Sequence, residues 1–133
     1  MSEPTQGPGA RAQELALGAL LVLVVGLYWR TASHGFVAYD DPLYVSENPL
    51  VARGLSWDGF AWAFGFHAGN WHPLTWLSHM LDVELFGLAP GAHHLVSAAL
   101  HALNTALLFF LVRRLTGAGW SALLVAALFA LHP

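Results

Sequence analysis

Three stretches of the chain are almost purely apolar, running from Leu15 to Trp29, from Leu95 to Val112 and from Trp120 to Leu131. A helix needs about 20 apolar residues to cross a bilayer, so the first and third runs need flanking residues to reach that length. Tyr28 and Trp29 beside Arg30 suit the headgroup region at the end of the first run. The pattern predicts an all-α integral membrane protein with about three transmembrane helices and a helical loop after the first.

The residues around each run give the expected boundaries. Pro90 and Gly91 form a natural helix entry, so the second span starts before its apolar run. The short segment 115–119 contains two glycines and makes the second and third spans antiparallel neighbours. The expected divisions are a tail at 1–14 and then a membrane domain at 15–133, with spans at about 13–31, 91–113 and 119–133 and a loop at 32–90.

The first apolar run also has the length of the apolar region of a signal peptide. Glu3 and Glu14 precede it with only Arg11 as a basic residue, and no convincing small-x-small cleavage site follows it. A retained membrane anchor is therefore favoured over a cleaved signal.

Composition excludes several classes of protein. Hydrophobic residues make up 56% of the 133 residues and charged residues only 10%, whereas a soluble domain carries about 25% charged residues. This balance argues against a free-standing soluble domain and against disorder. The chain has five Arg, no Lys and a net charge of −3, so no nucleic-acid partner is expected. Without cysteine there is no disulfide or thiolate ligand.

The distribution of arginine predicts the orientation. Arg11, Arg113 and Arg114 fall on one side of the expected topology, while Arg30 lies at the other. Because arginine near the ends of spans favours the cytoplasmic side, we expect a multi-pass protein with a cytoplasmic N-terminus. Residues 31–94 then form an exoplasmic loop.

That loop is rich in tryptophan and is expected to fold. Ser56 can cap a helix at 57–64 that has Asp58 in its first turn, and a second helix can start at Pro73 and end at Gly87. One face of the second helix carries Leu74, Leu77, Leu81 and Leu85. Two arrangements fit: helices lying flat at the membrane surface, or helices packed against the ends of further spans.

Asp40 and Asp41 stand next to each other before Pro42. A carboxylate of such a pair is a candidate general base. The pair can also hold a divalent cation through oxygen ligands, or simply form a turn. Pro42 is expected to hold the backbone of Asp41 in an extended conformation.

Histidine is frequent in and near the loop, and the candidates there are His72, His79, His93 and His94. None has a recognised zinc spacing such as His-Glu-x-x-His, and adjacent His93 and His94 point to different sides of a helix. Interfacial or packing histidines are therefore favoured over a metal site made by histidines alone.

The second span carries polar residues on one helix face: His94, Ser97, His101 and Asn104. Polar groups in a span normally face a helix bundle or a wet cavity. This face either forms hydrogen bonds between helices or lines a substrate cavity.

Several motifs together point to a known family. The most specific is the block Asn70-Trp71-His72-Pro73-Leu74-Thr75-Trp76, followed by Ser78-His79. With Asp40-Asp41-Pro42, Asn48, His93-His94 and the final His132-Pro133, the chain resembles the N-terminal part of the transmembrane-and-tetratricopeptide-repeat O-mannosyltransferases. These belong to the GT-C superfamily of polytopic glycosyltransferases.

The resemblance implies part of a GT-C fold and an activity. Such enzymes take a sugar from a polyprenyl-phosphate carrier in the membrane and use an acidic pair in the first exoplasmic loop. In eukaryotic relatives the donor is dolichyl-phosphate mannose and the acceptor a Ser/Thr hydroxyl. Asp40 then matches the general base, with Asp41 orienting it or assisting a divalent cation. The substrate-binding candidates within the motifs are Asn48, His72, His79, His93 and His94.

The family continues past His132 and Pro133 into many more spans, so we expect a fragment that is inactive by itself and needs the remaining transmembrane helices as partners. The alternative is a small non-enzymatic membrane protein whose polar helix face binds partner helices. Further apolar spans encoded directly downstream would favour the enzyme.

Overall fold

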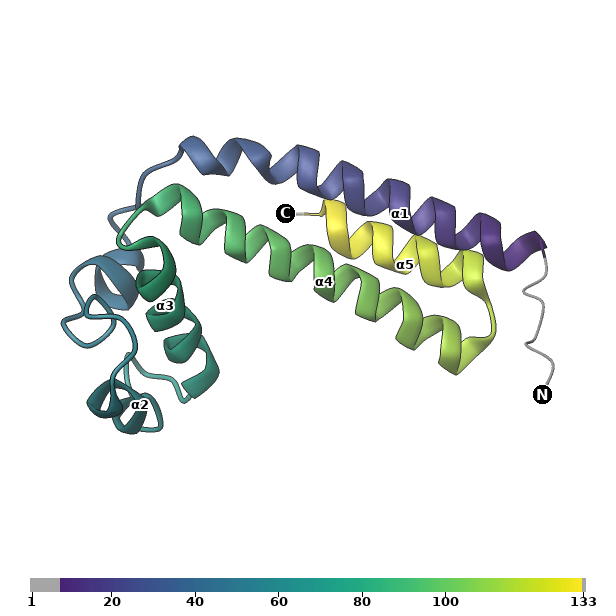
Figure 1. Ribbon diagram of the computed structural model, residues 1–133. Helices are drawn as coiled ribbons and strands as arrows, with labels where there is room; N and C mark the ends of the chain where they lie inside the picture. Colours follow the sequence, from purple (N-terminus) through teal and green to yellow (C-terminus); the bar gives the residue numbers. More distant parts are fainter. Residues whose placement is uncertain (1–7, 133) are drawn as a thin grey trace. The chain divides into compact units, whose positions relative to one another are not determined.

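The computed structural model describes residues 8–132, and this part of the chain contains helices and turns but no β-strand (Figure 1). The all-helical expectation is confirmed. The elements, in chain order, are α1 (Pro8–Tyr28), the 3₁₀ turn η1 (Trp29–Ser33), the π-helical turn η2 (Pro42–Ser46), α2 (Trp57–Ala63), α3 (Pro73–Phe86), α4 (Pro90–Thr116) and α5 (Gly119–Leu131).

The chain divides into two compact units. The three-helix unit consists of the described residues up to Arg30 and those from Ser97 onward, and the loop unit consists of residues Thr31–Val96. The first turns of α4 belong to the loop unit and the rest of α4 to the three-helix unit.

Two helical segments are long and apolar enough to cross a membrane: Gly9–Ser33 with 25 residues and Pro90–Thr116 with 27 residues. They contain the spans expected at 13–31 and 91–113. The helix that corresponds to the expected third span, α5, has only 13 residues, which is less than the ~20 that a membrane crossing requires. Two candidate spans are therefore present in the described residues, and the third stays a prediction. Pro133, the expected end of that span, lies outside the described residues, as do residues 1–7 of the expected tail.

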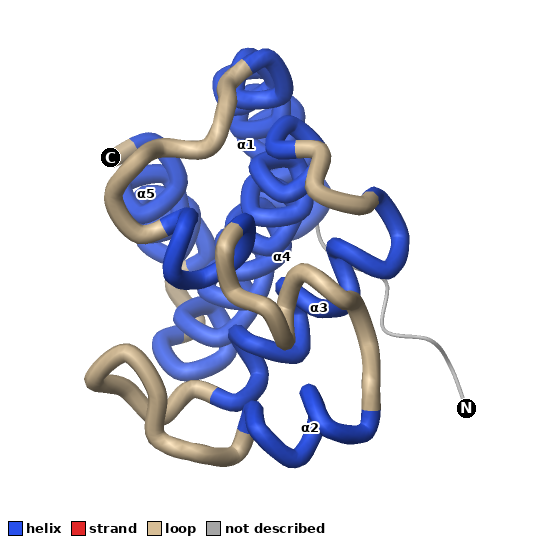
Figure 2. Tube along the Cα trace, turned by 90° about the vertical axis from the view of Figure 1, so that its left-hand side faces the viewer, coloured by secondary structure: helices blue, strands red, loops and turns tan. Residues whose placement is uncertain are grey.

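Within the three-helix unit, α4 runs antiparallel to α1 and α5 (Figure 1), and Figure 2 views these helices nearly end-on. The turn between α4 and α5 uses Gly117 at a φ of 71°, a left-handed conformation that suits glycine. Small residues on one face of α5 let it approach α1 closely. The core contains Leu17, Leu20 and Val24 of α1, Phe109 of α4 and Ala122, Ala126 and Ala130 of α5.

The polar residues of α4 do not share one environment. In the three-helix unit, the Nε2–H of His101 donates to the backbone carbonyl of Ala130 at 3.1 Å, and its ring meets Tyr28 edge-on. Asn104 and Ser97 are exposed. Of the two alternatives for this face, a hydrogen bond between helices is present at His101, whereas Asn104 is exposed.

In the loop unit, α2, α3 and η2 pack around the buried side chains of Trp76 and Met80. Both helix starts follow the sequence signals. The hydroxyl of Ser56 accepts a hydrogen bond from the backbone N–H of Gly59 at 3.0 Å, and Pro73 occupies the first turn of α3. At its other end, α3 is followed by Gly87, which has a φ of 61°. Most of the leucine face of α3 points outward, because Leu74, Leu81 and Leu85 are exposed.

Candidate functional site

The acidic pair lies in a turn that leads directly into η2. The backbone N–H of Tyr44 donates to the carbonyl of Asp40 at 2.9 Å, and the backbone N–H of Glu47 donates to the carbonyl of Pro42 at 2.9 Å. These bonds continue the helical turn across the proline. Asp41 has φ −58° and ψ −36°, which is helical. The expectation of an extended backbone at Asp41 was wrong, because the helical turn outweighs the local steric bias from Pro42.

The two carboxylates have different surroundings. The Oδ2 atom of Asp41 accepts a hydrogen bond from the backbone N–H of Val37 at 2.7 Å, which fixes the direction of that side chain. The side chain of Asp40 is exposed. Asp41 is thus held by the turn, and Asp40 presents its carboxylate to the surroundings.

An open cavity of about 460 Å³ lies beside this pair. Its lining includes Tyr39 and Pro42, the residues on either side of the two aspartates, and Trp62 of α2. The other lining residues are Leu43, Glu47, Asn48, Pro49 and Leu50. The cavity is large enough for a small polar group and is mostly apolar in lining, as ligand pockets generally are.

Asn48 lines this cavity, but its side-chain amide forms hydrogen bonds with the backbone. Its Nδ2 donates to the carbonyl of Leu43 at 3.2 Å, while its Oδ1 accepts from the backbone N–H groups of Leu50 at 3.1 Å and Val51 at 3.3 Å. Asn48 therefore shapes the wall of the cavity through the turn that it holds.

His72 belongs to an aromatic cluster at the start of α3. Its ring stacks on Tyr44 with centroids 5.6 Å apart, and Tyr44 stacks on Trp76 at 4.8 Å. Trp62 meets Trp76 edge-on and stacks on His67 at 3.9 Å. This cluster joins η2, α2 and α3 and so supports the segment that carries the acidic pair.

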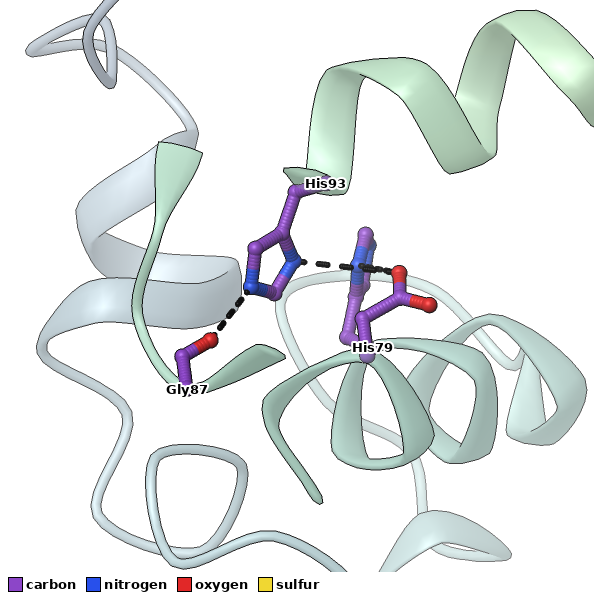
Figure 3. Close-up of polar contacts among 4 residues, drawn as sticks. His79, Gly87 and His93 are labelled. Carbon is purple, nitrogen blue, oxygen red and sulfur yellow. Dashed lines mark hydrogen bonds and ion pairs between the residues drawn. The ribbon is translucent and has the colours of Figure 1, made fainter. Parts of the chain in front are cut away.

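His79 and His93 converge on a carboxylate that the sequence did not single out, that of Asp82 (Figure 3). The Nδ1 atom of His79 lies 4.0 Å and that of His93 3.7 Å from Oδ2 of Asp82. The Nε2–H of His93 donates to the carbonyl of Gly87 at 3.0 Å. Asp82 lies three residues after His79 on α3, while His93 comes from the first turn of α4.

Burial shifts the protonation of this cluster. The side chains of Asp82 and His93 are only 7% and 5% exposed, and that of His79 is 24% exposed. Burial lowers the pKa of His79, against the attraction of Asp82, which raises it. Burial also raises the pKa of Asp82, while His93 and His79 oppose this shift. Smaller effects on the pKa of His79 come from the charge of His93, which lowers it, of Asp41, which raises it, and of His72, which lowers it.

His94 turns away from this cluster. Its Nε2–H donates to the carbonyl of Gly35 at 3.3 Å, and its ring lies edge-on to Phe36. The adjacent histidines thus have different hydrogen-bond partners, although both rings lie edge-on to Phe36. Of the four predicted histidines, the structure brings His79 and His93 together in this cluster. The His79-x-x-Asp82 spacing was a signal for the third member of the cluster, but nothing in the sequence indicated the approach of His93.

Comparison with known proteins supports the resemblance drawn from the motifs. The protein O-mannosyl-transferase Tmtc1 of Drosophila melanogaster is 36% identical over 126 residues, which cover 88% of this chain. The protein O-mannosyl-transferases TMTC2 of Mus musculus and of Homo sapiens are each 31% identical over 119 residues, or 84% of this chain. The chain is a relative of the TMTC group.

The chain spans 14% of the length of these curated TMTC relatives. The matching region includes most of the chain, so the TMTC relationship extends over both structural units. No family model matches the chain. No solved structure matches it either.

Proposed function

We propose that this chain forms part of a membrane glycosyltransferase that transfers mannose from a polyprenyl-phosphate carrier to a Ser or Thr hydroxyl of a protein. The relatives are named protein O-mannosyl-transferases, and two helical segments of this chain are long and apolar enough to reach a lipid-linked donor in a membrane. The observation that carries the proposal is the acidic pair beside an open cavity, with Asp41 held and Asp40 exposed.

The proposed chemistry is a single displacement. A hydroxyl is a poor nucleophile at neutral pH, so a carboxylate within hydrogen-bond reach is needed to accept its proton. Asp40 takes this proton while the hydroxyl oxygen attacks the anomeric carbon. The bond between that carbon and the carrier phosphate oxygen breaks, and the phosphate leaves with the electron pair. Attack opposite to the leaving group inverts the anomeric configuration.

Asp41 is assigned a positioning role. The hydrogen bond from Val37 uses one of its oxygens and fixes the orientation of the turn that carries Asp40. Its other oxygen and the carboxylate of Asp40 supply hard ligands should a divalent cation take part. Among the substrate-binding candidates, Asn48 contributes to the cavity wall, and His72 supports the segment through stacking.

A chimera tests the proposal in the context of a complete enzyme. The matching region of Drosophila Tmtc1 is replaced by residues 8–132 of this chain, and mannose transfer from polyprenyl-phosphate mannose to a Ser/Thr peptide is measured in membranes. Asp40→Asn keeps the size of the side chain but removes its ability to accept the proton. We expect transfer to fall by about 10²- to 10⁴-fold, the usual contribution of general-base catalysis, with a smaller fall for Asp41→Asn.

Asp58→Asn is the matched control, because Asp58 is an exposed acid of the same unit that lies away from the cavity lining. It is expected to keep the transfer rate of the parent chimera. A collapse in Asp41→Asn with normal transfer in Asp40→Asn would exchange the two roles. Normal transfer in both variants, or a stably inserted chimera without transfer, would contradict the proposal.

The alternative function, a non-enzymatic membrane protein that binds partner helices, is favoured by one observation. Asn104 is exposed on α4 in the middle of an apolar helix, where a partner helix could supply a hydrogen-bond partner. Asn104→Leu would then weaken a specific complex in membranes, whereas Asp40→Asn would change nothing measurable.

A further inference from the structure

We propose that His79, Asp82 and His93 form a binding site for a divalent transition-metal ion, with Zn²⁺ as the ion that best suits the ligands. The inference goes beyond the proposed sugar transfer and does not depend on it. One candidate ligand atom from each of the three residues lies within 4.8 Å of the others. Figure 3 shows the ring of His93 between the carbonyl of Gly87 and the ring of His79, with dashed lines for its contacts to Gly87 and to the carboxylate.

The distances favour a bridging ion over direct hydrogen bonds. A good N–H···O hydrogen bond spans about 2.7–3.2 Å, but the two Nδ1 atoms lie 4.0 and 3.7 Å from the carboxylate oxygen. Zn–N and Zn–O bonds of about 2.0–2.2 Å in a tetrahedral site separate the ligand atoms by roughly 3.3–3.5 Å. A small contraction of the cluster would therefore close it around an ion.

The cluster also contains buried nitrogen atoms that lack a hydrogen-bond partner. The Nδ1 atoms of His79 and His93 are buried and form no hydrogen bond. The side chain of His93 is only 5% exposed. Leaving such buried groups unsatisfied is costly. A cation between them would satisfy both nitrogens and also the carboxylate of Asp82.

The hydrogen bond of His93 to Gly87 selects the tautomer that a metal needs. A carbonyl can only accept, so the proton sits on Nε2 and the lone pair of Nδ1 is directed toward Asp82. Metal-bound histidines usually donate their second N–H to a carbonyl or carboxylate in this way.

The donor set points to the class of metal. Two imidazole nitrogens and one carboxylate oxygen match the three protein ligands of many zinc sites, in which a fourth position is left for water. Mg²⁺ and Ca²⁺ prefer sites made entirely of oxygen. Since His79 and Asp82 lie on α3 and His93 on the first turn of α4, the bound ion would fasten these two helices within the loop unit.

The test uses the full 133-residue chain in detergent micelles, stripped of metal and then titrated with Zn²⁺ or Co²⁺. We expect one Zn²⁺ per chain and a visible absorption band from Co²⁺ in a four-coordinate site. Altering residues that only orient metal ligands costs about 10- to 100-fold in affinity. Removing a ligand in His79→Gln, His93→Gln or Asp82→Asn should therefore weaken Zn²⁺ binding by more than about 100-fold.

Substitution of a buried ligand can unfold the chain, so the test also relies on variants at more exposed positions. His79 is the most exposed of the three, so His79→Gln should retain its helical circular dichroism, and His79→Cys should bind Co²⁺ with a new sulfur-to-cobalt charge-transfer band. His34→Gln removes an exposed histidine of the same unit and should leave binding unchanged. No stoichiometric Zn²⁺ in the folded wild-type chain, or equal binding in His79→Gln, would overturn the proposal.

Discussion

Ser56 sets the start of α2 through a single hydrogen bond to the N–H of Gly59. Replacing a serine cap by alanine typically costs about 1 kcal/mol of helix stability, a large cost for a helix of seven residues. We expect Ser56→Ala to speed amide hydrogen exchange within α2 by several-fold. Ser97→Ala, at an exposed position of α4, is the control and should leave this exchange unchanged.

Gly91 allows the chain after α1 to pass close to the start of α4. A Cβ atom at this position would overlap the backbone carbonyl of Ala32, and backbone cannot move aside as a flexible side chain can. We expect Gly91→Ala to destabilise the loop unit by about 1–3 kcal/mol, the usual cost of overpacking. Thermal unfolding in detergent measures this cost.

Gly18→Ala provides the matched control for that substitution, since nothing lies within 4 Å of a Cβ atom at Gly18. Alanine is a better helix former than glycine, so this variant should unfold at the same or a higher temperature. Equal melting of Gly91→Ala and the wild-type chain would show that the two segments separate without cost.

Single residues with local roles could be predicted from the sequence. Ser56, Pro73 and Gly87 act through bonds or backbone angles within one turn, so their types alone indicated the helix ends. The backbone conformation of Asp41 was predicted wrongly, because the helical turn that leads into η2 outweighs the steric effect of the adjacent Pro42. Asp82 was missed because its partner His93 approaches from another helix, which no periodicity encodes.

At the scale of helices, α5 packs on α1 through a stripe of alanines that are fully buried. Ala126→Leu adds a large side chain where none fits, and overpacking of this kind costs about 1–3 kcal/mol. We expect the unfolding temperature of the chain in detergent to fall. Val125→Leu, an enlargement at an exposed neighbouring position, should leave it nearly unchanged.

The existence and approximate ends of the helices were predictable because long apolar runs and helix-breaking residues mark them. The number of spans stays a prediction, because α5, with 13 residues, is shorter than the ~20 that a membrane crossing requires. The exposed leucines of α3 show a similar limit. Their spacing indicated a shared face, but spacing alone does not tell whether protein or lipid covers it.

For the whole molecule, charge near the ends of the long helices determines the expected orientation. Arg113 at the end of α4 forms an ion pair with Glu14 of α1 at 3.3 Å, so the N-terminal part of α1 and the C-terminal end of α4 lie at the same end of the three-helix unit. Arg11 and Arg114 belong to the same two helix ends. The arginine bias predicts that this end faces the cytoplasm.

The orientation can be measured because the chain has no cysteine of its own. Ala38→Cys places an exposed thiol in the loop unit, and Ala118→Cys places one in the turn after α4. In intact cells, a membrane-impermeant thiol reagent should label Ala38→Cys at once, but should label Ala118→Cys only after permeabilisation. The reverse pattern would put the acidic pair on the cytoplasmic side, where the proposed exoplasmic transfer could not occur. Labelling of both thiols in intact cells would instead show that α4 does not cross the membrane.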